Sequence, residues 1–316
     1  MPYKVVVATR SFGTTSQEPW DVLAEGGCVP VAVDILQLTD EEFAEVLRDA
    51  DGLIVGRRPV TADIIANASR LKVISMHGVG VDHIDLEAAK AQGVAVANCP
   101  DANFNSVADL TLGLMVAVAR QIPQVSQAVQ GGEWGRFSGV EVWEKTLGLV
   151  GLGRVGRGVA RRATGFQMSV LVYDPYLTVA EVEDAGGRMV ALDELLAEAD
   201  FVSLHAPLTE ETQHMINREA LRRMKPTAYL VNTARGELVD EEALYEALTQ
   251  GMIAGAALDV FTKEPPGDSP VLGLPNVVVT PHIGAHTREA TTNASIMAAR
   301  NVVQALQTGE PVHRVI

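Results

Sequence analysis

TLGLVGLGRVGRGVARRAT, residues 146–164, is the stretch that decides the fold. Its first part, Thr146 to Val150, is an apolar run of the length of a buried strand. From Arg157 onward, apolar residues recur three and four apart, as on one face of a helix. The glycines between the two segments are Gly151, Gly153 and Gly156. Glycines at this spacing, with a strand before and a helix after, predict a tight strand–turn–helix unit of an α/β fold.

Each glycine of the turn has a physical use. The first permits the tight turn, the second lets the backbone approach a pyrophosphate, and the third lets the helix pack closely on the strand. The helix N-terminus adds unpaired N–H groups and positive potential, which suit a bound phosphate. The stretch therefore predicts a dinucleotide site, although three glycines alone are a weak signal.

A carboxylate follows the next predicted strand. The run Ser169–Tyr173 ends in Asp174, 18 residues beyond Gly156 (174 − 156). A carboxylate there can accept hydrogen bonds from the adenosine ribose and would repel a 2′-phosphate. We therefore expect NAD rather than NADP as the cofactor. The alternative reading of Asp174 is a solvated acid that closes a strand.

Short apolar runs alternate with helical patterns along the whole chain, which predicts α/β domains built on parallel, doubly wound sheets. Helical patterns fall at 40–49, 85–92, 157–164, 193–199 and 240–249, and Asp40, Asp193 and Asp240 are the expected N-caps. The predicted strands are Val5–Thr9, Val31–Ile35, Gly52–Val55, Val73–Met76, Leu147–Val150, Val170–Tyr173, Phe201–Leu204, Tyr229–Asn232, Ala256–Val260 and Val277–Thr280.

The predicted elements form two series. The first runs from residue 1 to about 98, and the second opens at Thr146. Between them lies a long apolar helix candidate, about 106–120, which suits a core or interdomain helix and also part of a dimer interface. A chain of 316 residues suits two domains better than one.

Composition excludes several classes of function. The formal net charge is −15, so the surface repels nucleic acid and anionic membranes. Cys28 and Cys99 match no metal or redox spacing, and we expect two reduced thiols and no metal site. The start of the chain has no secretory signal, and the longest apolar candidate, Leu110 to Ala119, is too short to span a membrane. These features predict a cytoplasmic protein.

Three further segments place a polar residue where a buried strand stops. They carry Arg235, Glu264 and His282. Taken singly, each has an ordinary reading, as a surface cation, a loop acid and a structural histidine. Together they fit the interconversion of a secondary alcohol and a ketone, with His282 as the base and Glu264 as the acid that orients it. Arg235 would then clamp a carboxylate.

With these motifs, the chain resembles the D-isomer-specific 2-hydroxyacid dehydrogenases, and most closely their D-3-phosphoglycerate dehydrogenase branch. The resemblance covers essentially all 316 residues, and it implies a small 2-hydroxy acid as substrate. The motifs that carry it are the glycine turn, DGLIV at 51–55, GVGVD at 78–82, NTARG at 232–236, LDVF at 258–261 and TPHIGA at 280–285.

The resemblance implies a nucleotide domain of Rossmann type, residues 99–286, inserted into a flavodoxin-like substrate domain, residues 1–98 plus 287–316. It also implies a cleft that closes on substrate and, commonly, a homodimer. Arg235, Glu264 and His282 would be catalytic. Substrate would be bound by His77, Gly78, Val79, Arg235 and His282. The cofactor would be bound by Gly151, Gly153, Arg154, Val155, Gly156, Asp174, His205, Pro207, Thr233, Ala234, Asp259 and Gly284.

The match departs from the branch at two places. Phosphoglycerate-specific relatives carry an arginine where this chain has Gly56, and another where it has Met76. Arg57 or Arg58 could replace the lost cation through a shifted turn, or the substrate could lack a phosphate. His77 could contact substrate or fill space. Because the chain stops at Ile316, we expect no serine-sensing regulatory domains.

Two other functions remain open. One is a reductase of glyoxylate, hydroxypyruvate or another 2-keto acid, because residues do not fix the direction of the reaction. The other is an NAD-sensing scaffold like the corepressors that share this fold, which the absence of long disordered tails argues against. Assay of a panel of hydroxy and keto acids separates them.

Overall fold

The computed structural model describes residues 2–35 and 37–316 and divides the chain into two compact units. Unit 1 comprises residues 1–103 and 285–316, and unit 2 comprises residues 104–284. Unit 2 is thus inserted between two segments of unit 1. The sequence-based boundaries were placed at 98/99 and 286/287.

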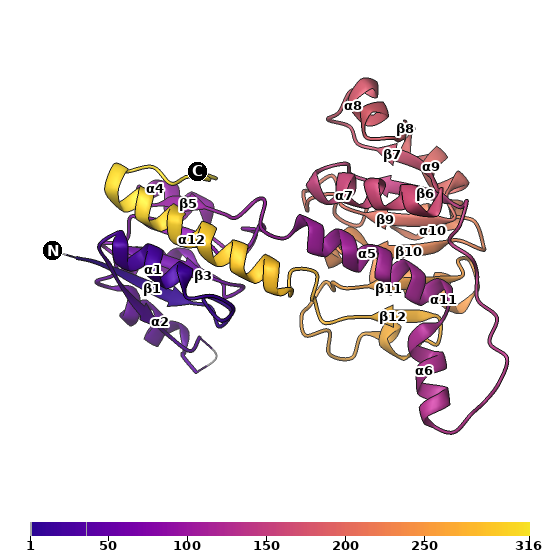
Figure 1. Cartoon of the computed structure of the whole chain (residues 1–316), viewed down its shortest axis with the longest axis horizontal. Coiled ribbons are helices and arrows are strands. Elements are labelled where there is room, and N and C mark those ends of the chain that lie inside the picture. The colour runs from indigo at the N-terminus through magenta and orange to yellow at the C-terminus, as the bar shows by residue number, and fades with distance from the viewer. Residues whose placement is uncertain (1, 36) are drawn as a thin grey trace. The chain divides into compact units, whose positions relative to one another are not determined.

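Unit 1 contains a five-stranded parallel sheet in the order β2-β1-β3-β4-β5 (Figure 1). This is the flavodoxin-like order, with a change of winding direction between β1 and β3. Its strands are β1 Tyr3–Ala8, β2 Cys28–Ala32, β3 Gly52–Val55, β4 Val73–Met76 and β5 Ala95–Ala97. Its helices are α1 Glu18–Glu25, α2 Asp40–Leu47, α3 Ala62–Asn67, α4 Leu86–Ala91 and α12 Arg288–Thr308.

Helices cover both faces of this sheet, which is why its central strands are continuous apolar runs. On one face, buried Phe43 of α2 and Ile65 of α3 lie in a cluster with Leu53. On the other face, Leu23 of α1 and Val302 of α12 are fully buried. Figure 1 shows α12, in yellow, running across the sheet. Two hydrophobic layers therefore hold unit 1 together.

Unit 2 contains a seven-stranded parallel sheet in the order β12-β11-β10-β9-β6-β7-β8, which is the Rossmann order extended by one strand. Its strands are β6 Thr146–Val150, β7 Ser169–Tyr173, β8 Arg188–Met189, β9 Phe201–Leu204, β10 Tyr229–Asn232, β11 Gly255–Leu258 and β12 Val277–Val279. Its helices are α5 Phe104–Ala119, α6 Ile122–Gln130, α7 Arg154–Ala163, α8 Val179–Asp184, α9 Leu192–Glu198, α10 Arg218–Arg223 and α11 Glu241–Thr249.

The predicted fold class is confirmed: both sheets are parallel and covered on both faces. In unit 2, one layer buries Met115 of α5 and Val159 of α7, and the other buries Leu195 of α9 and Leu244 of α11. None of the helices in the described part of the chain has an apolar stretch long enough to cross a bilayer.

The prediction was wrong at the start of one strand and at the caps of two helices. The second strand begins at Cys28 rather than Val31, because Pro30 lies in an edge strand, where a missing N–H is tolerated. The caps of two helices lie upstream of the predicted aspartates: Thr39 caps α2 through a capping box with Glu42, and α9 begins at Leu192. Asp240 is the N-cap of α11, as predicted.

Candidate active site

The candidate residues of unit 2 all follow the carboxyl ends of parallel strands, so they lie along one edge of the seven-stranded sheet. Ligands of open α/β sheets bind at this edge, beside the point where the strand order reverses. Here that point lies between β6 and β9. The residues of this edge are Gly151 after β6, Asp174 after β7, His205 after β9, Thr233 to Arg235 after β10, Asp259 after β11 and His282 after β12.

The glycine turn after β6 has the spacing that a dinucleotide needs. Gly151 has a φ of 93°, and a Cβ there would lie 2.8 Å from the carbonyl of His205. A Cβ at Gly156 would lie 2.4 Å from the carbonyl oxygen of Gly151. By contrast, a Cβ at Gly153 would meet no atom within 4 Å among the described residues. The middle glycine therefore faces open space, and Arg154 and Val155 begin α7 directly after it.

Asp174 is held by the turn that it faces. Its Oδ2 accepts a hydrogen bond from the Leu152 N–H at 2.9 Å, and its Oδ1 accepts one from the Tyr176 N–H at 3.0 Å. Each carboxylate oxygen has two lone pairs, so each can accept one further hydrogen bond. This arrangement fits the ribose hydroxyls of an adenosine.

His205 closes the other side of the turn. Its Nε2 lies 2.9 Å from the Ser203 hydroxyl, and burial lowers the pKa of His205 to about 4, because the charged ring would lose its water. The ring is therefore neutral at physiological pH. Pro207, two residues on, is exposed and accepts a hydrogen bond from Thr212 through its carbonyl.

The loop after β10 is shaped by a buried asparagine that the sequence prediction did not single out. Asn232 is 1% exposed; its side chain accepts from the Ala234 N–H at 3.0 Å and donates to the Arg235 carbonyl at 2.7 Å. Thr233 lies 2.9 Å from the hydroxyl of Thr111 on α5. The sequence signal that could have identified Asn232 is a polar residue at the end of a buried strand.

Gly236 brings the Arg235 loop against the loop after β11. A Cβ at this position would lie 2.0 Å from the carbonyl carbon of Phe261 and 2.3 Å from the Thr262 nitrogen. Both are backbone atoms, so no side chain can be accommodated without moving one of the loops. The residue that follows Arg235 thus packs on the segment that leads to Glu264.

Glu264 and His282 are joined directly. Both Oε atoms of Glu264 lie 3.0 Å from Nδ1 of His282, and Oε1 also accepts the Phe261 N–H at 3.1 Å. The side chains are 18% and 30% exposed, so the pair is shielded and still reachable. An imidazole whose Nδ1–H is donated to a carboxylate has its Nε2 as the nitrogen that exchanges a proton with a substrate.

Asp259 fixes the backbone on both sides of His282. Its carboxylate, 1% exposed, accepts from the Thr280 hydroxyl at 2.6 Å and from the N–H groups of Ile283 and Gly284 at 2.8 Å each. These contacts bracket His282, which has a left-handed φ of 52° that is uncommon for a non-glycine residue. The predicted role of Asp259 was cofactor binding; the contacts described here are with the histidine loop.

The remaining candidates lie in unit 1, at the carboxyl ends of β3 and β4. His77, Gly78 and Val79 follow β4. Arg58, after β3, donates to the carbonyls of Ile35, Leu38 and Thr39 and to the Asp40 carboxylate, and its guanidinium lies 4.6 Å from the centre of the Phe43 ring. Arg58 is thus committed to structure, while Arg57 is exposed.

The chain is similar in sequence to known dehydrogenases and reductases. Residues 112–284 match the family model "D-isomer specific 2-hydroxyacid dehydrogenase, NAD binding domain". The chain is 49% identical over 299 residues to a D-3-phosphoglycerate dehydrogenase of Methanocaldococcus jannaschii, covering 93% of this chain and 56% of that one. It is 44% identical over 276 residues to a hydroxypyruvate reductase of Thermotoga maritima, covering 85% and 89%.

A solved structure is also similar over the whole chain. The glyoxylate reductase of Paecilomyes thermophila superposes with a TM-score of 0.90 at 31% identity, covering 99% of this chain and 98% of that one. The chain spans about half the length of the curated D-3-phosphoglycerate dehydrogenases of Methanocaldococcus jannaschii, Archaeoglobus fulgidus and Mycobacterium bovis.

Proposed function

The chain belongs to the D-isomer specific 2-hydroxyacid dehydrogenase family, and we propose that it interconverts a small D-2-hydroxy acid and its 2-keto acid, with His282 as the acid and base. The observation that carries the proposal is the contact between Glu264 and His282 Nδ1 at 3.0 Å. It stands at the sheet edge that also carries the glycine turn.

His282 moves the proton of the substrate oxygen in this proposal. In oxidation, its Nε2 takes the hydroxyl proton, and in reduction the doubly protonated ring gives one back. The Glu264 carboxylate stabilises the positive charge that the ring then carries, and it holds the Nδ1–H tautomer that leaves Nε2 as the base. Asp259 keeps the histidine backbone in its left-handed conformation.

Arg235 is the proposed cation for the substrate, since a guanidinium matches a carboxylate in bidentate fashion and polarises an adjacent carbonyl. The bound nicotinamide cofactor supplies the hydride chemistry. Gly153 and the N-terminus of α7 are proposed to receive the pyrophosphate, and Asp174 the adenosine ribose. Because a carboxylate repels a 2′-phosphate, we propose NAD as the preferred cofactor.

A phosphorylated acid such as 3-phosphoglycerate is one candidate substrate, on the similarity to phosphoglycerate dehydrogenases. One observation favours an unphosphorylated acid. The Arg58 guanidinium already donates hydrogen bonds to three backbone carbonyls and to the Asp40 carboxylate. In addition, Met76 and Gly56 occupy the positions where phosphate-specific relatives carry arginine. Arg57, which also follows β3, is exposed. We therefore propose hydroxypyruvate or glyoxylate as the second candidate pair of substrates.

A second copy of the chain is the proposed partner. We call α6 and residues 131–145 the arm. None of the residues of α6 is buried, and Trp134 is 90% exposed, with Phe137 and Trp143 about half exposed. Figure 1 shows the arm leaving the body of unit 2 and returning to β6. An exposed aromatic surface of this kind marks an interaction site.

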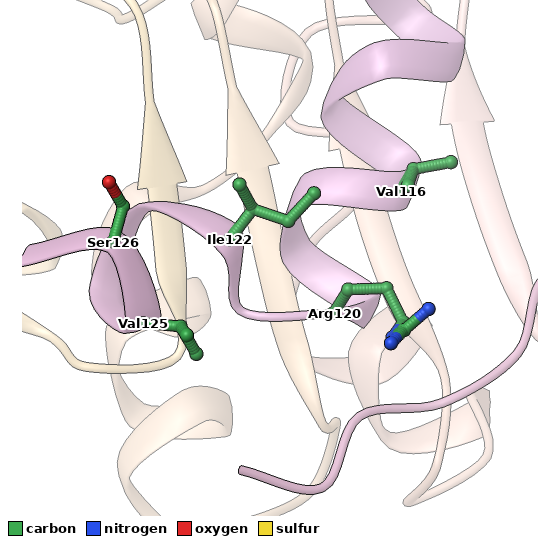
Figure 2. Close-up of a pocket in the computed structure, with 5 residues that line it drawn as sticks. All are labelled: Val116, Arg120, Ile122, Val125 and Ser126. Atoms are coloured by element: carbon green, nitrogen blue, oxygen red, sulfur yellow. The ribbon is translucent and has the colours of Figure 1, made fainter. Parts of the chain in front are cut away.

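The acceptor for such a surface lies on the same chain. A hollow of about 390 Å³ is lined by Val116, Arg120, Ile122, Val125 and Ser126 where α5 meets α6 (Figure 2). Its apolar side chains and its guanidinium suit an aromatic ring. Each chain carries both the exposed Trp134 and the hollow. In a two-fold symmetric dimer, an aromatic residue of each copy would therefore enter the hollow of the other copy.

The test of the activity is a panel assay on the purified protein. Hydroxypyruvate, glyoxylate and 3-phosphohydroxypyruvate are offered with NADH, and glycerate and 3-phosphoglycerate with NAD, while the absorbance of the reduced nicotinamide is followed. We expect turnover of at least one keto acid, and a loss of at least about 100-fold in kcat for His282→Ala with NADH binding retained. A His282→Ala variant that keeps the wild-type rate on every accepted acid would exclude His282 as the acid and base.

A further inference from the structure

We propose that His77 is a positioning residue: its ring bridges Ser11 and Ser295 and thereby fixes the N–H groups of Gly78 and Val79 that receive the substrate carboxylate. The inference rests on the proposed function and assigns a role to a side chain that the reaction itself does not use. All the residues of the bridge lie in unit 1.

The first half of the bridge reaches α12. Nε2 of His77 lies 2.8 Å from the Ser295 hydroxyl, which donates its own proton to the Thr291 carbonyl at 2.7 Å. A hydroxyl has only one proton, so Ser295 accepts from His77, and the ring carries its hydrogen on Nε2. Ser295 is fully buried and also accepts the Gly13 N–H at 3.3 Å.

The second half of the bridge reaches the loop after β1. With its hydrogen on Nε2, the neutral ring presents the Nδ1 lone pair to the Ser11 hydroxyl, 3.3 Å away. Ser11 in turn lies 3.1 Å from the Thr9 hydroxyl, which can donate to it. The Phe12 ring packs against the imidazole at 6.1 Å between centres. Burial lowers the pKa of His77 to about 4, so the ring is neutral at physiological pH, as this pattern of donors requires.

The bridge anchors the backbone that follows it. The His77 N–H donates to the Val55 carbonyl at 2.8 Å, the Gly78 carbonyl accepts from Cys99 at 2.7 Å, and the Val79 carbonyl accepts from Asn98 at 2.8 Å. Among the described residues, the N–H groups of Gly78 and Val79 have no protein acceptor. The carbonyls thus have protein partners, while the two adjacent N–H donors remain available to a ligand.

The contacts separate this role from the two simpler ones. A direct hydrogen bond from His77 to substrate would require one ring nitrogen to lose its hydrogen bond to Ser11 or Ser295. A side chain that only filled space would not need a hydrogen-bond partner at each nitrogen. Here one ring nitrogen donates to a serine hydroxyl and the other accepts from a second serine hydroxyl. The bridge instead joins three segments that are distant in sequence, the loop after β1, the loop after β4 and α12, at the residue that precedes the two donors.

The test uses oxamate, which has a carboxylate and a carbonyl and no distal group. Its affinity for the enzyme–NADH complex is measured by calorimetry for the wild type, His77→Leu, His77→Gln, Ser295→Ala and the double variant His77→Leu/Ser295→Ala, together with KM for hydroxypyruvate. Because either change breaks the bridge, we expect His77→Leu and Ser295→Ala each to weaken oxamate binding about tenfold, with KM for NADH unchanged. His77→Gln keeps a donor toward Ser295 and should lose much less.

The double variant decides between positioning and independent effects. Because both single changes break the same bridge, the double variant should bind oxamate about as weakly as either one. Additive losses would overturn the proposal, as would unchanged oxamate binding by His77→Leu. A rise in KM for hydroxypyruvate alone would point to a direct contact with the distal group and would also overturn it. If His77→Leu does not fold, oxamate binding by Ser295→Ala, which lacks a single hydroxyl, is compared with that by His77→Gln. Ser295→Ala should then bind oxamate more weakly than His77→Gln.

Failure of the proposed function looks different from failure of this inference. A wild-type protein that turns over no keto acid and binds no oxamate would refute the proposed function and this inference with it. An active wild type whose His77→Leu variant binds oxamate normally would refute only the role of the bridge.

Discussion

Replacing Glu264 with glutamine changes which atoms can accept a hydrogen bond while keeping the shape of the side chain. In the structure, Oε1 accepts the Phe261 N–H at 3.1 Å, and both oxygens lie 3.0 Å from His282 Nδ1. The amide oxygen of Glu264→Gln must stay beside Phe261, because the amide nitrogen cannot accept that N–H. The NH₂ group then takes the place of Oε2 beside Nδ1, so only one of the two oxygens that lie 3.0 Å from Nδ1 remains an acceptor, and the new neighbour is a donor.

The amide removes the negative charge that stabilises the protonated ring, and a ring that accepts from the new NH₂ group carries its hydrogen on Nε2 and is no longer a base. A hydrogen bond to a charged group contributes about 1.5–3 kcal/mol, or roughly 10- to 150-fold. A tautomer fixed on the wrong nitrogen adds to this loss, as it does in serine proteases, where the same kind of change costs about 10⁴-fold. We therefore expect kcat/KM to fall by about 10²- to 10⁴-fold for Glu264→Gln.

Initial rates with the best keto acid of the panel, NADH affinity by fluorescence and thermal denaturation give the three readouts. NADH affinity and melting temperature should change little, because the substitution preserves side-chain volume. Lys263→Gln is the matched control, since Lys263 is exposed and adjacent in sequence. A Glu264→Gln enzyme within about threefold of the wild-type kcat/KM, a difference below 1 kcal/mol, would refute the reasoning.

Three other outcomes follow from the structure. Asp174→Ala should lower the ratio of kcat/KM for NAD over NADP by about tenfold or more, because it removes the carboxylate that repels a 2′-phosphate; equal use of both cofactors by the wild type would contradict this. Gly236→Ala should lower the melting temperature strongly, since its Cβ would lie 2.0 Å from the Phe261 carbonyl carbon, whereas Gly165→Ala, where a Cβ meets nothing within 4 Å, should not; equal effects would be inconsistent with the packing of the two loops. Trp134→Ser should shift the chain from dimer to monomer in analytical ultracentrifugation, and a wild type that is already monomeric would exclude the arm as a dimer contact.

Much of the fold could be predicted from local patterns. The buried parallel strands gave continuous apolar runs, so β3, β4, β9 and β10 were placed with their observed bounds. The strands that escaped prediction, β5 and β8, are two or three residues long and lie at sheet edges. The pattern of residues carries little information about such strands.

Candidate site residues could be chosen from the sequence where a motif carried them. The glycine turn, Glu264 and His282 follow strands that could be located from the sequence. The supporting contacts were not predictable, because they join positions far apart in the chain: Thr111 with Thr233, and His77 with Ser295, 218 residues away. The sequence also could not show whether Arg58 binds a ligand or stabilises the fold. That depends on its hydrogen bonds to the carbonyls of Ile35, Leu38 and Thr39.

The most direct measurement follows the hydride itself. Deuterium carried on the nicotinamide of NADH is offered with the keto acid that the enzyme accepts, and the product is examined by proton NMR and chiral chromatography. We expect one deuterium at C2 of the D-isomer in the wild type, with formation of that product reduced at least about 100-fold in His282→Ala. An L-product, deuterium at another carbon, or no transfer by the wild type would contradict it.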